Sequence, residues 1–76
     1  MITVKLYGLL RLDSGIKERQ LEAANVAQVL TFLESQGISR RDLSGTVILV
    51  NGESATKRSK LKDGDVVQLL SPVAGG

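Results

Sequence analysis

The sequence predicts an α+β fold, in which one main helix packs against a mixed sheet of four to five strands. Three observations lead to this prediction: apolar and polar residues alternate at the start of the chain, an apolar stripe with helical spacing lies in the middle, and β-branched runs recur towards the end. With 76 residues, of which 42% are hydrophobic, the chain can bury the core of one small domain.

Residues 2–7 predict the first strand. Ile2, Val4 and Leu6 alternate with Thr, Lys and Tyr, which is the period of two that a half-buried strand shows. A turn over residues 8–15 is expected to follow. A second strand over residues 16–23 is less clearly marked, because charged residues dilute it, and we expect it to pair antiparallel with the first as a hairpin.

The clearest element is a helix that begins after Asn25. Asn25 is a favourable N-cap, and Gln28 stands three residues later, where it can complete a capping box. The apolar stripe of this helix consists of Val26, Val29, Leu30 and Leu33. Gly37 suits the left-handed position that ends a helix, and Ile38 can then pack on Leu33. Phe32 lies off the stripe, so we expect it at the edge of the core rather than in a binding site.

The remaining segments alternate between turns and strands. Residues 39–44 predict a loop with one helical turn, and the β-branched residues 46–50 predict a buried strand. Asn51-Gly52 is a strong hairpin-turn signal, after which a short strand from Glu53 is expected.

A second turn, in which Gly64 can take a positive φ, leads to the last strand over residues 66–70. The first and last strands are both apolar, which suits adjacent central positions in the sheet. A hairpin, a crossing helix and a returning strand in this order give the ubiquitin-like β-grasp arrangement. We expect residues 1–70 to form this domain and residues 71–76 to form a flexible C-terminal tail.

Two residue types are absent from the composition. Without Cys the chain offers no disulfide and no thiolate, and without His it lacks the commonest general base and metal ligand. These absences argue against most enzyme mechanisms and against a metal site. Tyr7 and Phe32 are the only aromatic residues, so the core should be aliphatic. No segment is long enough to span a membrane and no signal peptide precedes the fold, so we expect a cytoplasmic protein without a membrane partner.

Four cations lie close together at Lys57, Arg58, Lys60 and Lys62, although the net charge is only +2. A solvated loop is the simpler interpretation, and a docking patch for an acidic partner is the alternative. Nucleic acid is not expected, because no aromatic side chain is interleaved with these cations to stack on bases.

The chain closes with Ser-Pro-Val-Ala-Gly-Gly over residues 71–76. Pro72 should end the sheet, because it cannot donate a ladder hydrogen bond. Gly75 and Gly76 leave the carboxylate without a nearby Cβ, so this end can enter a narrow channel and its carbonyl can be approached from either side. A frayed chain end is the alternative. Together, a β-grasp pattern and a terminal Gly-Gly favour a carrier that reacts through the carboxylate of Gly76.

The missing thiol indicates the chemistry. A sulfur carrier without Cys cannot hold sulfur as a persulfide, but it can hold sulfur as a thiocarboxylate on Gly76. An ATP-using partner would adenylate the carboxylate, and a sulfur donor would then displace AMP from the electrophilic acyl-adenylate. The chain would thus be a protein co-substrate rather than an enzyme. It would bind no cofactor tightly, because the partner uses the ATP.

The sequence resembles the MoaD/ThiS sulfur-carrier family over nearly its whole length, and within that family it is most similar to the small subunit of molybdopterin synthase. The stretches that carry this resemblance are Ile2–Arg11, Val50–Gly52, Leu61–Val66 and Leu69–Gly76. The closing Pro-Val-Ala-Gly-Gly is the most specific part. Two features depart from the family: Leu12 follows Arg11 where a Glu is usual, and this chain is slightly basic whereas its branch is often acidic.

The resemblance implies a role in molybdenum-cofactor biosynthesis. Its implied partners are an E1-like adenylating enzyme, a sulfur donor, and the large subunit of molybdopterin synthase or another sulfur acceptor. The segment implied to thread into the large subunit consists of Pro72, Val73, Ala74 and Gly75, with the sulfur on Gly76. Tyr7 and Leu70 are implied to belong to an apolar docking face, with ordinary core packing as the alternative.

Other functions fit the same fold and tail. One is a ubiquitin-like protein modifier that is joined to lysines of other proteins. Another is a sulfur carrier for tRNA thiolation or for the thiamine thiazole. A third belongs to a different class: a passive β-grasp binding module that docks through its sheet and leaves its tail idle. The final sulfur acceptor stays open at this point.

Overall fold

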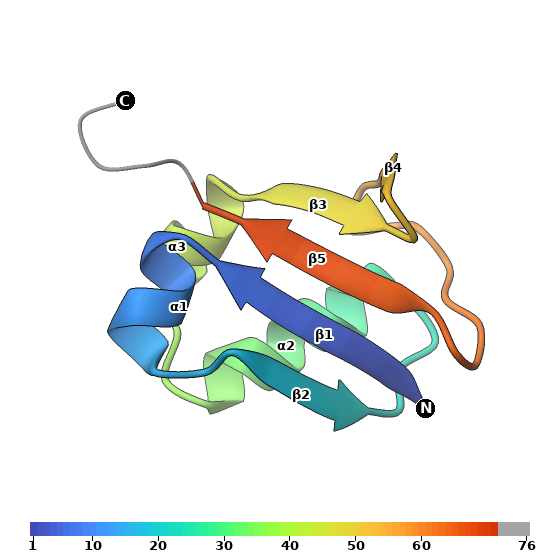
Figure 1. Ribbon diagram of the computed structural model, residues 1–76, viewed down its shortest axis with the longest axis horizontal. Helices are drawn as coiled ribbons and strands as arrows, with labels where there is room; N and C mark the ends of the chain where they lie inside the picture. The colour runs from blue at the N-terminus through green and yellow to red at the C-terminus, as the bar shows by residue number, and fades with distance from the viewer. Residues whose placement is uncertain (72–76) are drawn as a thin grey trace.

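In the computed structural model, which describes residues 1–71, the first and last strands lie side by side (Figure 1). Strand β1 (Ile2–Tyr7) runs parallel to β5 (Val66–Leu70) and antiparallel to β2 (Glu18–Leu21). On its other side, β5 pairs antiparallel with β3 (Val47–Val50), which forms a hairpin with β4 (Glu53–Ser54). The sheet order is β2-β1-β5-β3-β4. The predicted ubiquitin-like β-grasp arrangement is therefore confirmed.

Helix α2 (Val26–Ser35) crosses one face of the sheet and has the predicted signals at both ends. Asn25 Oδ1 accepts a hydrogen bond from the Gln28 amide at 2.9 Å. The Gln28 side chain reaches back to the amide of Ala24 at 2.7 Å, one residue before the partner of a standard capping box. At the other end the Ile38 amide donates to the Leu33 carbonyl, which is the Schellman hydrogen bond expected where Gly37 has φ 96°.

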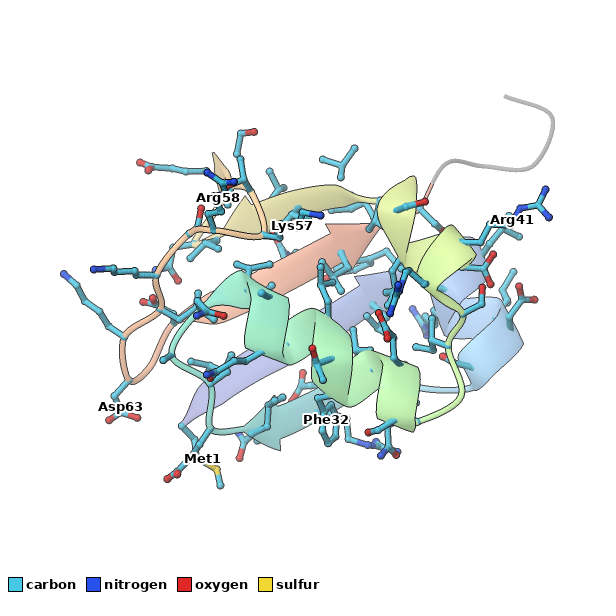
Figure 2. The ribbon with its side chains drawn as sticks, turned by 180° about the vertical axis from the view of Figure 1, so that it is seen from behind. Met1, Phe32, Arg41, Lys57, Arg58 and Asp63 are labelled. Carbon is cyan, nitrogen blue, oxygen red and sulfur yellow. The ribbon has the colours of Figure 1, made fainter. Side chains whose placement is uncertain are left out.

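The core between α2 and the sheet is entirely aliphatic, as the sequence predicts. Its buried side chains are Ile2, Val4, Leu6, Leu10, Ile16, Val26, Val29, Leu33, Ile38, Leu43, Leu61, Val67 and Leu69. They come from β1, α1, α2, α3, β5 and the connecting loops, whereas Leu21 of β2 and Ile48 and Val50 of β3 are only partly buried at the core edge. The core therefore forms only when the two ends of the chain come together. Phe32 is half-buried at the core edge on the β2 side of α2, where we expected it (Figure 2).

The segment over residues 8–15 is not a simple turn. It contains a short helix, α1 (Leu9–Ser14), whose Leu10 is buried in the core and whose end is closed by Gly15 in the left-handed conformation. Six residues are fewer than two helical turns, so their apolar spacing cannot establish a period. The second strand is also shorter than predicted, because Ile16 turns into the core before β2 begins.

Two further details concern the segment before and within β3. The helical turn expected near residue 40 is α3 (Arg40–Ser44), in which the Ser39 side chain accepts a hydrogen bond from the Asp42 amide. The prediction that residues 46–50 are buried is wrong for Val47, which is 56% exposed. Ile48 and Val50 pack against the core, so Val47 projects to the opposite face of the sheet.

A polar clasp joins the β3–β4 turn to the start of β5. Asn51 and Gly52 both have positive φ, as a type I′ turn requires. The Asn51 side chain accepts a hydrogen bond from the Val66 amide and donates one to Asp65, both at 2.9 Å. Asp65 also accepts from the Lys62 amide at 2.8 Å. The hydrogen bond from the Lys62 amide, followed by that from Asn51, lowers the pKa of the Asp65 carboxyl below its usual value.

This clasp predicts a pH-dependent contribution to stability. Because the folded-state pKa of Asp65 is lowered, the ionised carboxylate stabilises the fold at neutral pH. That contribution is lost as the pH falls below about 4, the pKa of Asp65 in the unfolded chain, and through its lower pKa in the folded protein. Asp65→Asn should therefore be less stable than the wild type in urea denaturation at pH 7, and the difference should shrink in acid. A difference that stays constant down to strongly acidic pH would contradict this assignment.

Candidate functional site

In Figure 1, α2 and α3 lie behind the sheet and α1 lies beyond the end of β1, so the front face of the strands is not covered by a helix of residues 1–71. The strand register places Tyr7 beside Leu70, and Leu70 beside Val47, across three adjacent strands. Tyr7 and Leu70 are half-buried and lie outside the buried core, and Val47 is exposed. We call these three residues the apolar row. The two residues predicted to form a docking face thus lie together on the uncovered side of the sheet.

A second row of side chains supports the first. Lys5, Gln68 and Leu49 are neighbours in the register, one step along the same face. Gln68 Nε2 donates a hydrogen bond to the Tyr7 hydroxyl at 3.2 Å, so the phenol group lies over the sheet rather than standing into solvent. A partner that covers the apolar row would therefore meet a side chain already held in one orientation, which lowers the entropy lost on binding.

The chain leaves the sheet beside this row, at a fixed point. Ser71 Oγ donates to the Tyr7 carbonyl and accepts from the Leu10 amide, each at 3.2 Å. Gly8 makes the close approach possible: an added Cβ would lie 2.7 Å from Ser71 Oγ and 2.9 Å from the Ser71 carbonyl oxygen. Gly8 also has φ 68° and ψ −141°, a combination that only glycine adopts easily. We call this contact the Ser71 junction.

Cations border the row on the β2 side. Lys5, Arg11 and Lys17 line a shallow depression of about 210 Å³ together with Tyr7, and Glu18 is the single carboxylate among its lining residues. Arg11 comes from α1, and the other two cations come from β1 and from the residue before β2. The arrangement favours a partner surface that has an apolar centre and acidic groups at one side.

The predicted reactive and threading residues of the tail lie outside the described residues. They are Pro72, Val73, Ala74, Gly75 and Gly76. The structure adds three residues that sequence reasoning missed: Val47, Gly8 and Ser71. Only Gly8, placed directly after a strand, offered a signal in the sequence.

The carboxyl groups with lowered pKa lie away from this face. Asp65 immediately precedes β5, whose far end is Leu70, and Asp63 is in the same turn. A hydrogen bond from the N-terminal ammonium group and its charge lower the pKa of Asp63. Asp63 therefore links this turn to the start of the chain, whereas Asp65 closes the turn itself. In residues 1–71 no group of three potential ligands could hold a metal ion. Over the same residues, no helix has the length and apolar character needed to cross a bilayer.

Comparisons with known proteins agree with the fold. The family model described as the ThiS family matches residues 4–76. SAMP1 from Haloferax volcanii has a TM-score of 0.85 and 24% identity over 99% of this chain and 98% of that chain, a likeness that shows the fold alone. The search of curated proteins found no match.

Two further similar structures are complexes. A chain from the complex of subunits 1 and 2 of molybdopterin-converting factor from Helicobacter pylori 26695 is 25% identical, with a TM-score of 0.75 over 99% of this chain and 97% of that chain. A chain from the BexX/CysO complex of Amycolatopsis orientalis is 27% identical, with a TM-score of 0.75, and the alignment covers 100% of both chains.

The Ser71 junction predicts that Gly8 is intolerant of substitution. Gly8→Ala should lower the free energy of unfolding by about 1–3 kcal/mol, because it combines a strained φ/ψ with a collision at Ser71. Chemical denaturation would measure this. Gly45→Ala is the matched control, since Gly45 has φ −91° and nothing lies within 4 Å of its added Cβ. Equal stabilities for the two variants would show that the junction imposes no constraint.

Proposed function

The chain belongs to the ThiS family, and on that basis we propose that it carries sulfur as a thiocarboxylate on Gly76. Members of this family are small carrier proteins rather than catalysts. The observation that carries the proposal is the extent of the family match, which runs through residue 76 and so includes both closing glycines. The absence of Cys supports the same chemistry, because no thiol competes to hold the sulfur.

The proposed reaction has two steps. An oxygen of the Gly76 carboxylate attacks the α-phosphorus of ATP on an E1-like adenylating enzyme, and pyrophosphate leaves. A sulfur nucleophile then attacks the activated carbonyl carbon, the bond from that carbon to the AMP oxygen breaks, and AMP leaves. With sulfide as the donor, one oxygen of the carboxylate is exchanged for sulfur without a change of oxidation state. This chain supplies the reacting carboxylate, and its partners supply the catalytic groups.

The apolar row is the proposed docking surface for these partners. The Ser71 junction holds the chain at the end of the row, so a partner seated on Tyr7, Leu70 and Val47 lies next to the point from which residues 72–76 continue. The two similar chains found in complexes support a role in association with other proteins. The adenylating enzyme and the sulfur acceptor would use this surface in turn.

For the pathway we propose molybdenum-cofactor synthesis in the cytoplasm, with this chain as the small subunit of molybdopterin synthase. The similarity to a chain of the molybdopterin-converting factor complex supports this assignment, as does the closing Pro-Val-Ala-Gly-Gly. The large subunit of the synthase would then be the sulfur acceptor. A sulfur carrier for another acceptor would share every step up to the thiocarboxylate, and a protein modifier would share the adenylation alone.

The first prediction of this proposal concerns the mass of the protein. After incubation with ATP, the adenylating enzyme of its host and sulfide, the chain should gain the mass of one sulfur minus one oxygen, located at Gly76 by fragmentation. Oxidation of Met1, the single methionine, adds nearly the same mass. Iodoacetamide resolves the ambiguity, because a chain without Cys has no thiol except the new thiocarboxylate to alkylate.

A variant lacking Gly75 and Gly76 is the control for the mass experiment, and it should stay unmodified while it melts at the wild-type temperature. Gly76 found in isopeptide bonds to lysines would instead support the protein modifier. An unmodified wild-type chain, with an enzyme shown to be active on another substrate, would favour the passive binding module.

The second prediction concerns the apolar row. Val47→Asp should weaken binding to the adenylating enzyme by more than about tenfold, because a carboxylate would be buried against an apolar surface without a counter-charge. Its fold should be unchanged, since Val47 is 56% exposed. Isothermal titration calorimetry with the purified enzyme measures both the affinity and the stoichiometry.

Gln20→Asp is the matched control for the apolar row. Gln20 is exposed on the same face of the sheet, beside Thr3 and at the end away from Ser71, and it receives the same charge. An equal loss of affinity in the two variants would show that net charge, rather than the row, determines binding. Leu70→Asp should weaken binding to the adenylating enzyme as Val47→Asp does. It should also lower the stability of the fold, because Leu70 is half-buried.

A further inference from the structure

A groove lies on the other side of the sheet, between α2, α3 and β3. Its volume is about 520 Å³, which is within the usual range for binding sites. Leu30, Leu43 and Ile48 form its apolar floor, and Lys57 stands at one end. Leu30 and Ile48 are only half-buried, so apolar surface is left open to solvent there. We call this feature the helix-side groove.

The two ends of the groove differ in charge. At the α3 end, Arg40 is paired with Glu34, with 3.5 Å between Arg40 Nε and Glu34 Oε1. At the other end, Lys57 makes no ion pair with any described residue, and Arg58 follows it (Figure 2). The beginning of α2 lies at this same end and adds the partial positive charge of a helix N-terminus. The groove is therefore close to neutral at one end and positive at the other.

Lys57 is held in place by the backbone around it. Its carbonyl accepts a hydrogen bond from the Ala27 amide at 2.9 Å, and the Ser59 carbonyl accepts one from the Val26 amide at 3.0 Å. The turn is closed by the Thr56 and Ser59 side chains, which accept from the amides of Arg58 and Thr56. These bonds fix the backbone of Lys57 relative to α2, so its side chain starts from a constant point beside this end of the groove.

The groove and the apolar row lie on opposite faces of the sheet, because successive side chains of β3 point to opposite sides. Ile48 faces the groove, and its neighbour Val47 faces the uncovered side of the sheet. A protein can therefore occupy the groove while another covers Tyr7, Leu70 and Val47. Each surface also has its own cations, because Lys5, Arg11 and Lys17 lie beside the row and Lys57 lies beside the groove.

We propose that the helix-side groove docks an extended segment of a partner protein that places an apolar side chain on Leu30, Leu43 and Ile48 and an acidic side chain against Lys57. An open groove covers only one side of its ligand, which suits a peptide better than a small molecule that needs near-complete burial. Charge complementarity sets the direction of the segment, with its acidic residue at the beginning of α2. This docking does not depend on the chemistry of the tail.

A phage-displayed library of random linear peptides, selected on the full-length protein, tests the proposal. The enriched sequences should combine apolar residues with Asp or Glu. The best of them, made as a synthetic peptide, should shift the amide NMR signals of residues in the groove and leave those of Tyr7, Val47 and Leu70 unchanged. Its affinity should fall as the salt concentration rises, since the contact at Lys57 is exposed.

Two variants at exposed positions test the groove without disturbing the core. Lys57→Glu should weaken the peptide at least about tenfold by reversing the charge at the rim. Thr31→Trp should do the same by filling the groove. Arg19→Glu is the matched control, because it makes the same charge change at an exposed position of β2, away from both surfaces, and should leave the affinity unchanged.

Three results would overturn the proposal. The first is enrichment of peptides without acidic residues, or no enrichment at all. The second is binding that Val47→Asp abolishes and Lys57→Glu does not, which would place the peptide on the apolar row. The third is a random-sequence RNA that shifts the same NMR signals as the peptide and binds more tightly than the peptide in physiological salt. That result would assign the cations to nucleic-acid binding.

Discussion

The parallel pairing of β1 with β5 is the contact on which the rest of the structure depends. It joins the start of the chain to its last strand, in a register that runs from Thr3–Val66 to Tyr7–Leu70. The two central strands are therefore about 60 residues apart in the sequence. Both strands bury one set of side chains under α2 and present the other set on the uncovered face. Because they run in the same direction, both end at the same edge of the sheet. The Ser71 junction can form only at that edge, where Tyr7 and Gly8 meet the end of β5.

This arrangement separates three tasks that a carrier must perform. The core stabilises the fold, and the polar clasp at Asn51 and Asp65 fixes the start of β5. At the other end, the apolar row and the Ser71 junction fix where the chain leaves the domain. The helix-side groove lies on the opposite side of β3 and leaves both of them uncovered. The two proposed binding surfaces, the apolar row and the helix-side groove, therefore lie on opposite faces of one small sheet.

Most of the fold could be predicted from the sequence, because its elements carry strong local signals. The alternation of β1, the caps of α2 and the Asn51-Gly52 turn all predict the structure that is found. Helix α1 could not be predicted, since it is too short to show a period and is held by the burial of Leu10. The exposure of Val47 could not be predicted, because β-branched residues are common on both faces of a sheet. The register of β3 against β5 places Val47 beside Leu70 and Ile48 beside the buried Leu69. The site was less predictable than the fold. Tyr7 and Leu70 were implied by resemblance, but the Ser71 junction and the helix-side groove arise from residues that are far apart in the sequence.

The central claim is that the carboxylate of Gly76 is activated as an acyl-adenylate, and oxygen-18 tests it most directly. The chain would be prepared with oxygen-18 in its C-terminal carboxylate and incubated with ATP, the adenylating enzyme of its host and sulfide. Because a carboxylate oxygen attacks the α-phosphorus and stays with AMP when sulfur displaces it, the AMP released should contain one oxygen-18. AMP without the label, formed while the chain acquires sulfur, would contradict activation through this carboxylate and require another route for the sulfur.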